Sequence, residues 1–150
     1  GTRIGERCIE NEIRSLAVAG KVSPIATVPE VRNYVDKKLR EFGRKKRIVM
    51  DGRDIGTVVF PNAERKVYVD ASAETRAQRR FDELQAKGDT STTYEEVLEN
   101  VKYRDHLDQT REESPLRKAD DAITLDNSTM TRDEQNQWLL DLYNSIVAQQ

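Results

Sequence analysis

The chain has 150 residues, the size of one domain with a single core, and is 36% hydrophobic and 35% charged. It carries 25 basic and 27 acidic residues, so no overall positive field would draw it to nucleic acid or to an anionic membrane. The lone Cys8 excludes an internal disulfide, and no apolar run reaches the length of a signal peptide or a membrane span. We therefore expect a cytoplasmic protein that binds neither nucleic acid nor membranes.

Two helices are predicted before residue 43. Residues 9–19 carry apolar side chains at helical spacing and stop at Gly20, a common end signal. A second helix should begin at Pro29, because proline at the first turn has no hydrogen bond to lose. Its apolar side chains recur on one stripe, which comprises Val31, Val35, Leu39 and Phe42.

Three short strands are predicted, at residues 47–50, 66–70 and 122–125, where β-branched and aromatic side chains cluster. Two charged helices at 73–87 and 93–110, separated by a turn at Gly88 and Asp89, resemble a mobile helical hairpin. A last helix should begin near Thr131, which has capping-box spacing to Glu134.

Strands that alternate with helices predict an α/β fold with a mainly parallel sheet and flanking helices. Three short strands are few for such a sheet, because parallel strands are normally covered on both faces and need neighbours at both edges. We therefore expect the sheet to be incomplete within these 150 residues.

The turn after residues 47–50 contains one arginine, two aspartates and two glycines (DGRDIG, residues 51–56). Ligands of open α/β sheets bind just beyond the carboxyl ends of the strands, so a site is expected here. Gly52 and Gly56 would let the backbone approach a ligand closely. An Arg–Asp pair that merely stabilises a loop fits the motif about as well, since Asp and Gly are common turn residues.

A second charged motif lies at the end of the 93–110 helix. Arg104, Asp108 and Arg111 stand at i, i+4 and i+7, so one helix face carries a positive, a negative and a positive side chain. This pattern fits a solvated row of ion pairs. It equally fits a site for a phosphate and a ribose diol, because arginine donates bidentately and aspartate accepts from hydroxyls.

A third group, Arg76, Arg79 and Arg80, lies on the helix that follows the 66–70 strand. The three guanidinium groups can be a solvated face. They can also form a lid that brings positive charge to a phosphoryl group in transfer.

Taken in order, these motifs resemble the cytidylate kinases of the nucleoside monophosphate kinase family. The resemblance covers essentially the whole chain and follows the family's order and nearly its spacing. It is carried by Ile13-Arg14, Ser23, Pro29, Val31-Arg32, the DGRDIGTVVFP run at 51–61, Arg104-Asp105, Asp108, Arg111, Ser114-Pro115-Leu116 and Asp121-Ala122. The DGRDxGTVVFP run is specific by itself, and the RDxxDxxR run downstream strengthens it.

The resemblance implies an enzyme that transfers a phosphoryl group from Mg²⁺-bound ATP to CMP or dCMP. It implies that Ser23, Arg32 and Asp54 hold the cytosine edge, and that Arg104 and Asp108 address the ribose. It further implies catalytic roles for four arginines. These are Arg53 and Arg111, which grip the CMP phosphate, and Arg79 and Arg80, which with Arg76 form the ATP lid.

The chain departs from the family in two respects: it lacks the phosphate loop, and it lacks the strand and Arg-bearing segment that complete the family's monophosphate pocket. Family members begin with a strand and a Gly-rich phosphate loop, whose backbone N–H groups and lysine hold ATP. The nearest fragment here, Gly20-Lys21, is followed by Val22 in place of Ser or Thr. We therefore expect a P-loop NTPase-like sheet without its N-terminal strands and phosphate loop, and a chain that is inactive alone.

By resemblance the chain divides into four parts: residues 1–28 belong to the monophosphate-binding subdomain, 29–72 to the core, 73–112 to the lid and 113–150 again to the core. No residue is predicted to bind a metal, so Mg²⁺ would arrive with ATP, and the complete protein is expected to be a monomer. Two other classes stay open. The first is a non-catalytic nucleotide-binding module, and the second is a basic-helix RNA-binding protein, which a pI of 5.6 disfavours.

Overall fold

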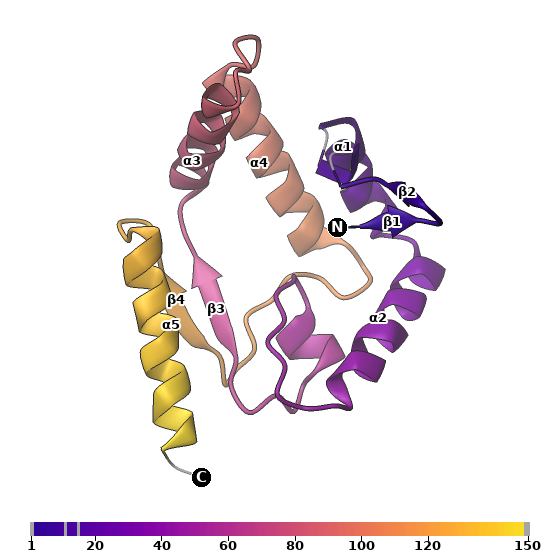
Figure 1. Cartoon of the computed structure of the whole chain (residues 1–150), viewed down its shortest axis with the longest axis vertical. Helices are drawn as coiled ribbons and strands as arrows, with labels where there is room; N and C mark the ends of the chain where they lie inside the picture. The colour runs from indigo at the N-terminus through magenta and orange to yellow at the C-terminus, as the bar shows by residue number, and fades with distance from the viewer. Residues whose placement is uncertain (1, 11, 15, 149–150) are drawn as a thin grey trace. The chain divides into compact units, whose positions relative to one another are not determined.

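The computed structural model describes residues 2–10, 12–14 and 16–148 (Figure 1). The chain divides into two compact units. The first comprises Gly1–Glu64 and Tyr103–Lys118, and the second comprises Arg65–Lys102 and Ala119–Gln150.

The first unit begins with a small antiparallel hairpin of β1 (Arg3–Ile4) and β2 (Arg7–Cys8). A short 3₁₀ turn, η1 (Glu12–Arg14), and helix α1 (Leu16–Ile25) follow. The helix predicted at 9–19 is therefore wrong in both of its ends. Ile9 donates its N–H to the carbonyl of Thr2 at 2.9 Å, which ties it to the hairpin, and α1 continues through Gly20 to Ile25.

Helix α2 (Pro29–Gly43) confirms the helix predicted from Pro29. Its buried side, however, is not the apolar stripe. Asp36 is the buried residue of α2, whereas Val35 and Phe42 are 44% and 60% exposed. Within the described residues, α2 therefore turns Arg32, Asp36 and Leu39 inward, whereas the other three residues of the predicted stripe are exposed.

The strand predicted at 47–50 does not form. Lys46 and Arg47 have φ values of 54° and 52°, in the left-handed region, so the backbone is not extended where the strand should begin. Val49 is 97% exposed, and no described residue pairs with this segment. A strand is stable only with hydrogen-bonded neighbours, which explains why strand propensity alone did not produce one here.

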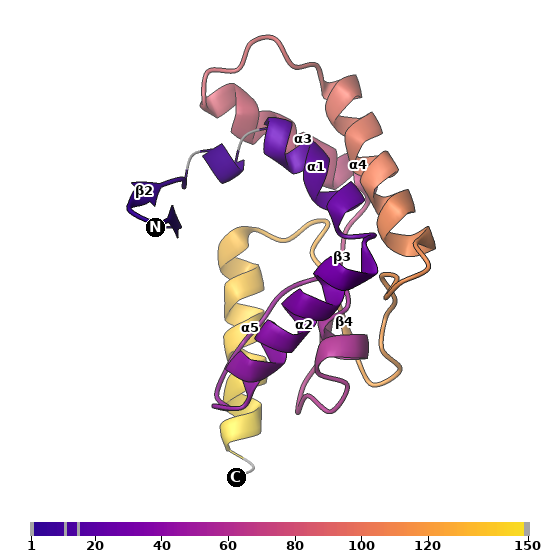
Figure 2. The same ribbon diagram turned by 90° about the vertical axis from the view of Figure 1, so that its right-hand side faces the viewer.

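A single wide turn, η2 (Ile55–Val59), follows Asp54 and is π-helical. The carbonyl of Asp54 accepts from the N–H groups of Thr57, Val58 and Val59 at 3.3, 2.9 and 3.2 Å, and Phe60 donates to Ile55 at 2.7 Å. π-helical turns are rare and occur often at functional sites. Figure 2 shows this short magenta turn beside α2.

The second unit contains a small parallel sheet of β3 (Val67–Asp70) and β4 (Ile123–Asp126), in register from Val67 opposite Ile123 to Asp70 opposite Asp126. These strands confirm two of the three predicted. Helices α3 (Ala73–Ala86) and α5 (Arg132–Val147) belong to the same unit, as does the beginning of α4 (Tyr94–Thr110). The chain thus has an α/β fold with a small parallel sheet.

The turn between α3 and α4 was predicted correctly, and Gly88 adopts a φ of 85° there. The two helices pack through a core of Ala77, Leu84 and Val97, all 8% exposed or less. Phe81 and Tyr94 add an edge-to-face contact with ring centroids 6.2 Å apart. The charged helices of the predicted hairpin are thus held together by a compact apolar seam.

Helix α5 begins with the predicted capping box. Thr131 Oγ1 accepts from the N–H of Glu134 at 3.2 Å, and Glu134 Oε2 accepts from the N–H of Thr131 at 2.8 Å. Both interactions satisfy N–H groups that the first helical turn would otherwise leave unpaired.

Replacing Thr131 by Ala should lower the free energy of unfolding by about 1 kcal/mol, because both halves of the capping box are lost. Urea denaturation followed by circular dichroism measures this change. Thr131→Ser should restore most of the stability, and Thr129→Ala, at an exposed position in the preceding loop, should have little effect. Equal stability of Thr131→Ala and wild type would show that the box does not stabilise α5.

Candidate functional site

The first unit contains a hollow of about 250 Å³. It is lined by Val22, Ala26, Arg32, Arg53, Asp54, Arg104, Asp108 and Arg111. Four guanidinium groups face two carboxylates, so the lining carries a net charge of +2. A polar hollow with excess positive charge suits an anionic ligand.

One side of the hollow is formed by Arg32 of α2 and Asp54. Arg32 Nη2 donates to Asp54 Oδ2, and Arg32 Nη1 donates to the carbonyl of Ala26 at 3.2 Å. Both side chains are largely buried, at 11% and 10% exposed. Burial strengthens such a pair and holds its geometry before any ligand binds. Among the described residues, no hydrogen bond is formed to the other carboxylate oxygen of Asp54, so it could accept from a ligand.

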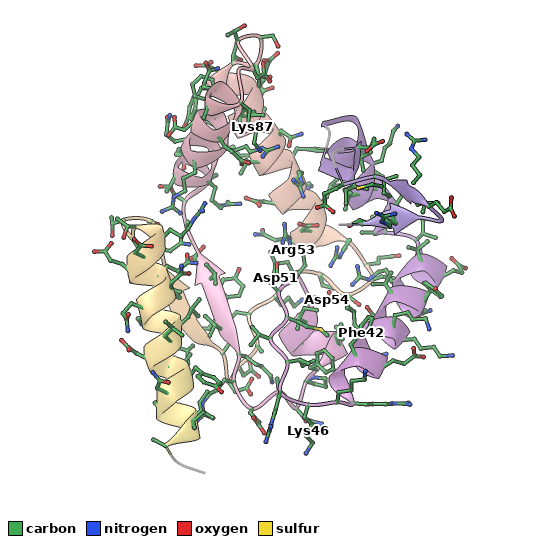
Figure 3. All side chains as sticks on the ribbon, viewed as in Figure 1. Phe42, Lys46, Asp51, Arg53, Asp54 and Lys87 are labelled. Carbon is green, nitrogen blue, oxygen red and sulfur yellow. The ribbon has the colours of Figure 1, made fainter. Side chains whose placement is uncertain are left out.

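A second group of lining residues is built around Asp108 of α4. Arg53 Nε donates to Asp108 Oδ2 at 2.8 Å, and Arg111 Nη1 lies 3.5 Å from Asp108 Oδ1. Asp108 is 6% exposed, whereas the Arg53 side chain is half-exposed. Arg53 and Asp54, labelled in Figure 3, are thus neighbours in sequence that pair with different elements. The DGRD motif and the RDxxDxxR motif meet at this site, as a functional reading of both requires.

Arg111 is more enclosed than Arg32 or Arg53, with 5% of its side chain exposed. Its Nε and Nη2 donate to the carbonyl of Ser114 at 2.9 and 2.7 Å. Burial, together with the positive charge of Arg32, lowers the pKa of Arg111 from its usual value. Arginine stays protonated regardless, so this shift indicates a positive charge that its surroundings compensate incompletely.

The two remaining residues predicted to bind the nucleotide are Arg104 and Ser23. Arg104 lines the hollow, and its Nε is buried without a hydrogen-bond partner among the described residues. A buried donor left unpaired is costly, and a ligand oxygen would relieve that cost. Ser23 belongs to α1, but its side chain lies outside the described part of the structure.

The three predicted lid arginines belong to the second unit, on α3. Arg76 Nε donates to the carbonyl of Ala71 at 3.0 Å, and Arg80 Nη1 donates to Glu83 at 2.8 Å. Arg79 donates to the carbonyls of residues 127, 128 and 130 at 2.6 to 3.4 Å and to the Asn127 side chain at 3.0 Å. Each therefore has a local partner within its own unit.

Sequence reasoning missed two charged residues of α2 beside this site, Asp36 and Arg40. Asp36 is 7% exposed, and its Oδ2 lies 4.0 Å from Arg40 Nη2. Arg40 also donates to the carbonyls of Val58 and Val59 in η2, at 3.1 and 3.4 Å. The available signal was the spacing of Arg32, Asp36 and Arg40, which repeats every four residues along one helix face.

Residues 2–145 match the family model described as cytidylate kinase. The chain belongs to the cytidylate kinase family. It is 61% identical over 139 residues to a cytidylate kinase of Parabacteroides distasonis and 56% identical over 139 residues to one of Flavobacterium johnsoniae. Each alignment covers 93% of this chain and 60% of the relative. A cytidylate kinase of Phocaeicola vulgatus is 54% identical over 146 residues, which cover 97% of this chain and 63% of the relative.

The chain thus spans about 60% of the length of the curated family members that it matches. The family match confirms the resemblance drawn from the DGRDxGTVVFP and RDxxDxxR runs. Among residues 2–10, 12–14 and 16–148, no helix is long and apolar enough to cross a membrane. In the same residues, no group of three or more His, Cys, Asp and Glu side chains is arranged to hold a metal ion.

Burial, and secondarily the charge of Asp54, raises the pKa of Asp36 above 3.8, although Arg32, Arg40 and Arg111 oppose the shift. The ionised form of Asp36 is therefore disfavoured in the folded state. The contribution of this carboxyl group to the free energy of unfolding is present below pH 3.8, where the group is protonated, and is lost as the pH rises through the raised pKa. Asp36→Asn should raise the Tm at pH 7, and the gain should shrink as the pH approaches 4.

Thermal unfolding between pH 4 and pH 8 measures this dependence, with Asp120→Asn, at an exposed position, as a matched carboxylate control. A lower Tm for Asp36→Asn throughout that range would show that the attraction of the three arginines outweighs the cost of burial.

Proposed function

We propose that the full-length protein transfers the γ-phosphoryl group of ATP to CMP or dCMP, with CDP or dCDP and ADP as products. The observation that carries this proposal is the pair of arginine-bound carboxylates, Asp54 and Asp108, in the lining of one positively charged hollow. They occupy the positions at which the family's two specific motifs fall. The proposal also rests on membership of the cytidylate kinase family.

The base would bind beside Asp54, Arg32 and Ser23. Arg32 occupies one oxygen of Asp54, which leaves the second to accept from the exocyclic amine of cytosine. Uracil presents a carbonyl oxygen at that position, so a buried carboxylate facing it would be left without a donor. Cytosine is therefore the base that this arrangement favours.

The phosphate and ribose would bind along the other side of the hollow. We assign the phosphate to Arg53 and Arg111 and the ribose hydroxyls to Arg104 and Asp108. Arg53 is held by Asp108 through Nε alone, so the rest of its half-exposed guanidinium can address phosphate oxygens. The buried, unpaired Nε of Arg104 is a further donor for a ligand oxygen.

In the reaction, an oxygen of the CMP phosphate forms a bond to the γ-phosphorus of ATP, and the bond from that phosphorus to the ADP oxygen breaks. The protein contributes orientation and charge stabilisation more than covalent chemistry. Arg76, Arg79 and Arg80 would provide lid charge near the transferred group, and Arg79 and Arg80 are proposed as catalytic. For Arg79 this requires release from the loop at 127–130, to which it donates.

The donor site is proposed to lie in a P-loop, which these 150 residues do not contain, so the chain alone is expected to be inactive. The four-part division into 1–28, 29–72, 73–112 and 113–150 is proposed with it. Mg²⁺ would enter with ATP, and the described residues form no metal-binding group of their own. We further propose a cytoplasmic monomer that does not bind nucleic acid or membranes.

A nucleotide-binding module without catalysis is a second candidate. The observation in its favour is that no G-x-x-x-x-G-K-[ST] run occurs in the sequence. Such a module would bind CMP through the hollow but would not convert it.

The full-length protein should convert CMP to CDP in the presence of ATP, and its kcat/KM for CMP should exceed that for UMP by more than about 100-fold, because Asp54 rejects the uracil carbonyl. A coupled assay of ADP release measures both values. Equal turnover of CMP and UMP would contradict the role of Asp54, and CMP binding without turnover would favour the non-catalytic module.

Arg53→Lys should lower kcat/KM for CMP roughly 10–100-fold, because lysine keeps the charge but loses the planar fork that binds two phosphate oxygens together. Steady-state kinetics of the full-length protein measures the loss. Arg65→Lys, a conservative change at an exposed position in the second unit, serves as the control. Wild-type kinetics for Arg53→Lys would contradict phosphate binding by Arg53 and would favour the alternative in which the DGRD motif only stabilises a turn.

A further inference from the structure

Helix α2 contacts the segment 54–60 at both of its ends. Near its N-terminus, Arg32 pairs with Asp54. At its C-terminus, Gly43 lies against Phe60, and a Cβ atom at Gly43 would be 2.2 Å from Cε1 and 2.5 Å from Cζ of the Phe60 ring. Only glycine allows this approach without displacing the ring. The segment that carries Asp54 is thus held between two fixed points of one helix.

Between these points, the carbonyl groups at the end of η2 need partners. A helical turn leaves its last carbonyl groups without partners inside the turn, and basic side chains commonly supply them. Arg40 does so from a different helix, since Nη2 donates to Val58 at 3.1 Å and Nε approaches Val59 at 3.4 Å. Arg40 therefore caps the C-terminal end of η2.

Asp36 lies one helical turn before Arg40, on the same side of α2. Its buried carboxylate is 4.0 Å from Arg40 Nη2, so it attracts the guanidinium toward the interior face of the helix. The Arg40 side chain is nevertheless half-exposed, and it lies outside the lining of the hollow. Arg40 is therefore not placed to touch a ligand in the hollow, and its contact with η2 is the route by which it would act on one.

The end of η2 is coupled to Asp54 by hydrogen bonds. The N–H groups of Val58 and Val59, whose carbonyls Arg40 holds, donate to the carbonyl of Asp54 at 2.9 and 3.2 Å. A shift of these two peptides therefore moves the backbone of Asp54, and with it the adjacent Arg53. Displacements of about 1 Å are enough to weaken binding and catalysis strongly.

We propose that Arg40 is a positioning residue of the nucleotide site, which fixes η2 so that Asp54 and Arg53 keep the geometry needed for the base and the phosphate. This role rests on the proposed function. The same contact could instead serve stability alone, and the two roles differ in their effect on base discrimination. Loss of stability lowers the affinity for CMP and UMP together, whereas a shifted Asp54 weakens CMP binding selectively.

The test compares Arg40→Met, Arg40→Lys and Lys38→Gln in the full-length protein. Methionine keeps much of the length but donates nothing, and lysine keeps a charged donor that can reach one carbonyl. Lys38 pairs with Glu41 at 2.9 Å on the exposed side of α2, so its substitution is a control for charge loss from the same helix. Three quantities are measured: Kd for CMP, Kd for UMP, and hydrogen exchange of the Phe60 amide, which closes η2.

We expect Arg40→Met to raise the Kd for CMP about tenfold, to reduce the ratio of UMP to CMP Kd, and to speed exchange at Phe60, at a temperature where the variant is folded. Arg40→Lys should recover most of each effect, and Lys38→Gln should change none. An unchanged CMP Kd and an unchanged ratio in Arg40→Met would overturn the positioning role. A wild-type protein that binds neither CMP nor dCMP would instead overturn the proposed function and, with it, this role.

Discussion

The candidate site depends on two buried carboxylates, Asp54 and Asp108, each held by arginine. A buried carboxylate is tolerated only where its charge is compensated, so each aspartate requires an arginine close by. That requirement brings α2 to the segment after residue 52 and brings the end of α4 to the same segment. Both ion pairs are made by the chain's own side chains. A nucleotide would therefore meet side chains that are already oriented, and little of its binding energy would be spent on ordering them.

The helices with local start signals and the strands that pair were predictable from the sequence, whereas the helix at 9–19 and the unpaired strand at 47–50 were predicted wrongly. The helices beginning at Pro29 and Arg132 carry local start signals that need no tertiary partner, and both form as expected. Residues 67–70 and 123–126 form strands because each supplies the other's hydrogen bonds. Residues 47–50 have comparable composition but no described partner, and the backbone there is irregular. Strand formation is a property of a pair, so one segment's composition could not decide it.

The site was predictable where side chains pair with side chains and not where they pair with backbone. The resemblance assigned Arg53 to the phosphate and Asp108 to the ribose of one nucleotide, and in the structure these two side chains pair with each other. Arg40 and Arg111 instead donate to the backbone carbonyls of Val59 and Ser114. Every residue has a carbonyl group, so the sequence does not indicate which one an arginine will contact. The burial of Asp36 could not be predicted either, because the apolar stripe of α2 indicated that a different face of the helix would be buried.

The unpaired segment at residues 48–50 affects the tendency of the chain to associate with other copies of itself. Ile48 and Val49 combine strand propensity with exposed apolar surface, and such segments favour association of one copy with another. Four consecutive basic residues, Arg44 to Arg47, precede them, and Asp51 follows. In a parallel, in-register pairing of two copies, these basic runs would face each other and repel, and the repulsion would weaken as salt is added. A basic segment whose repulsion depends on salt thus lies directly before an exposed apolar segment that favours association.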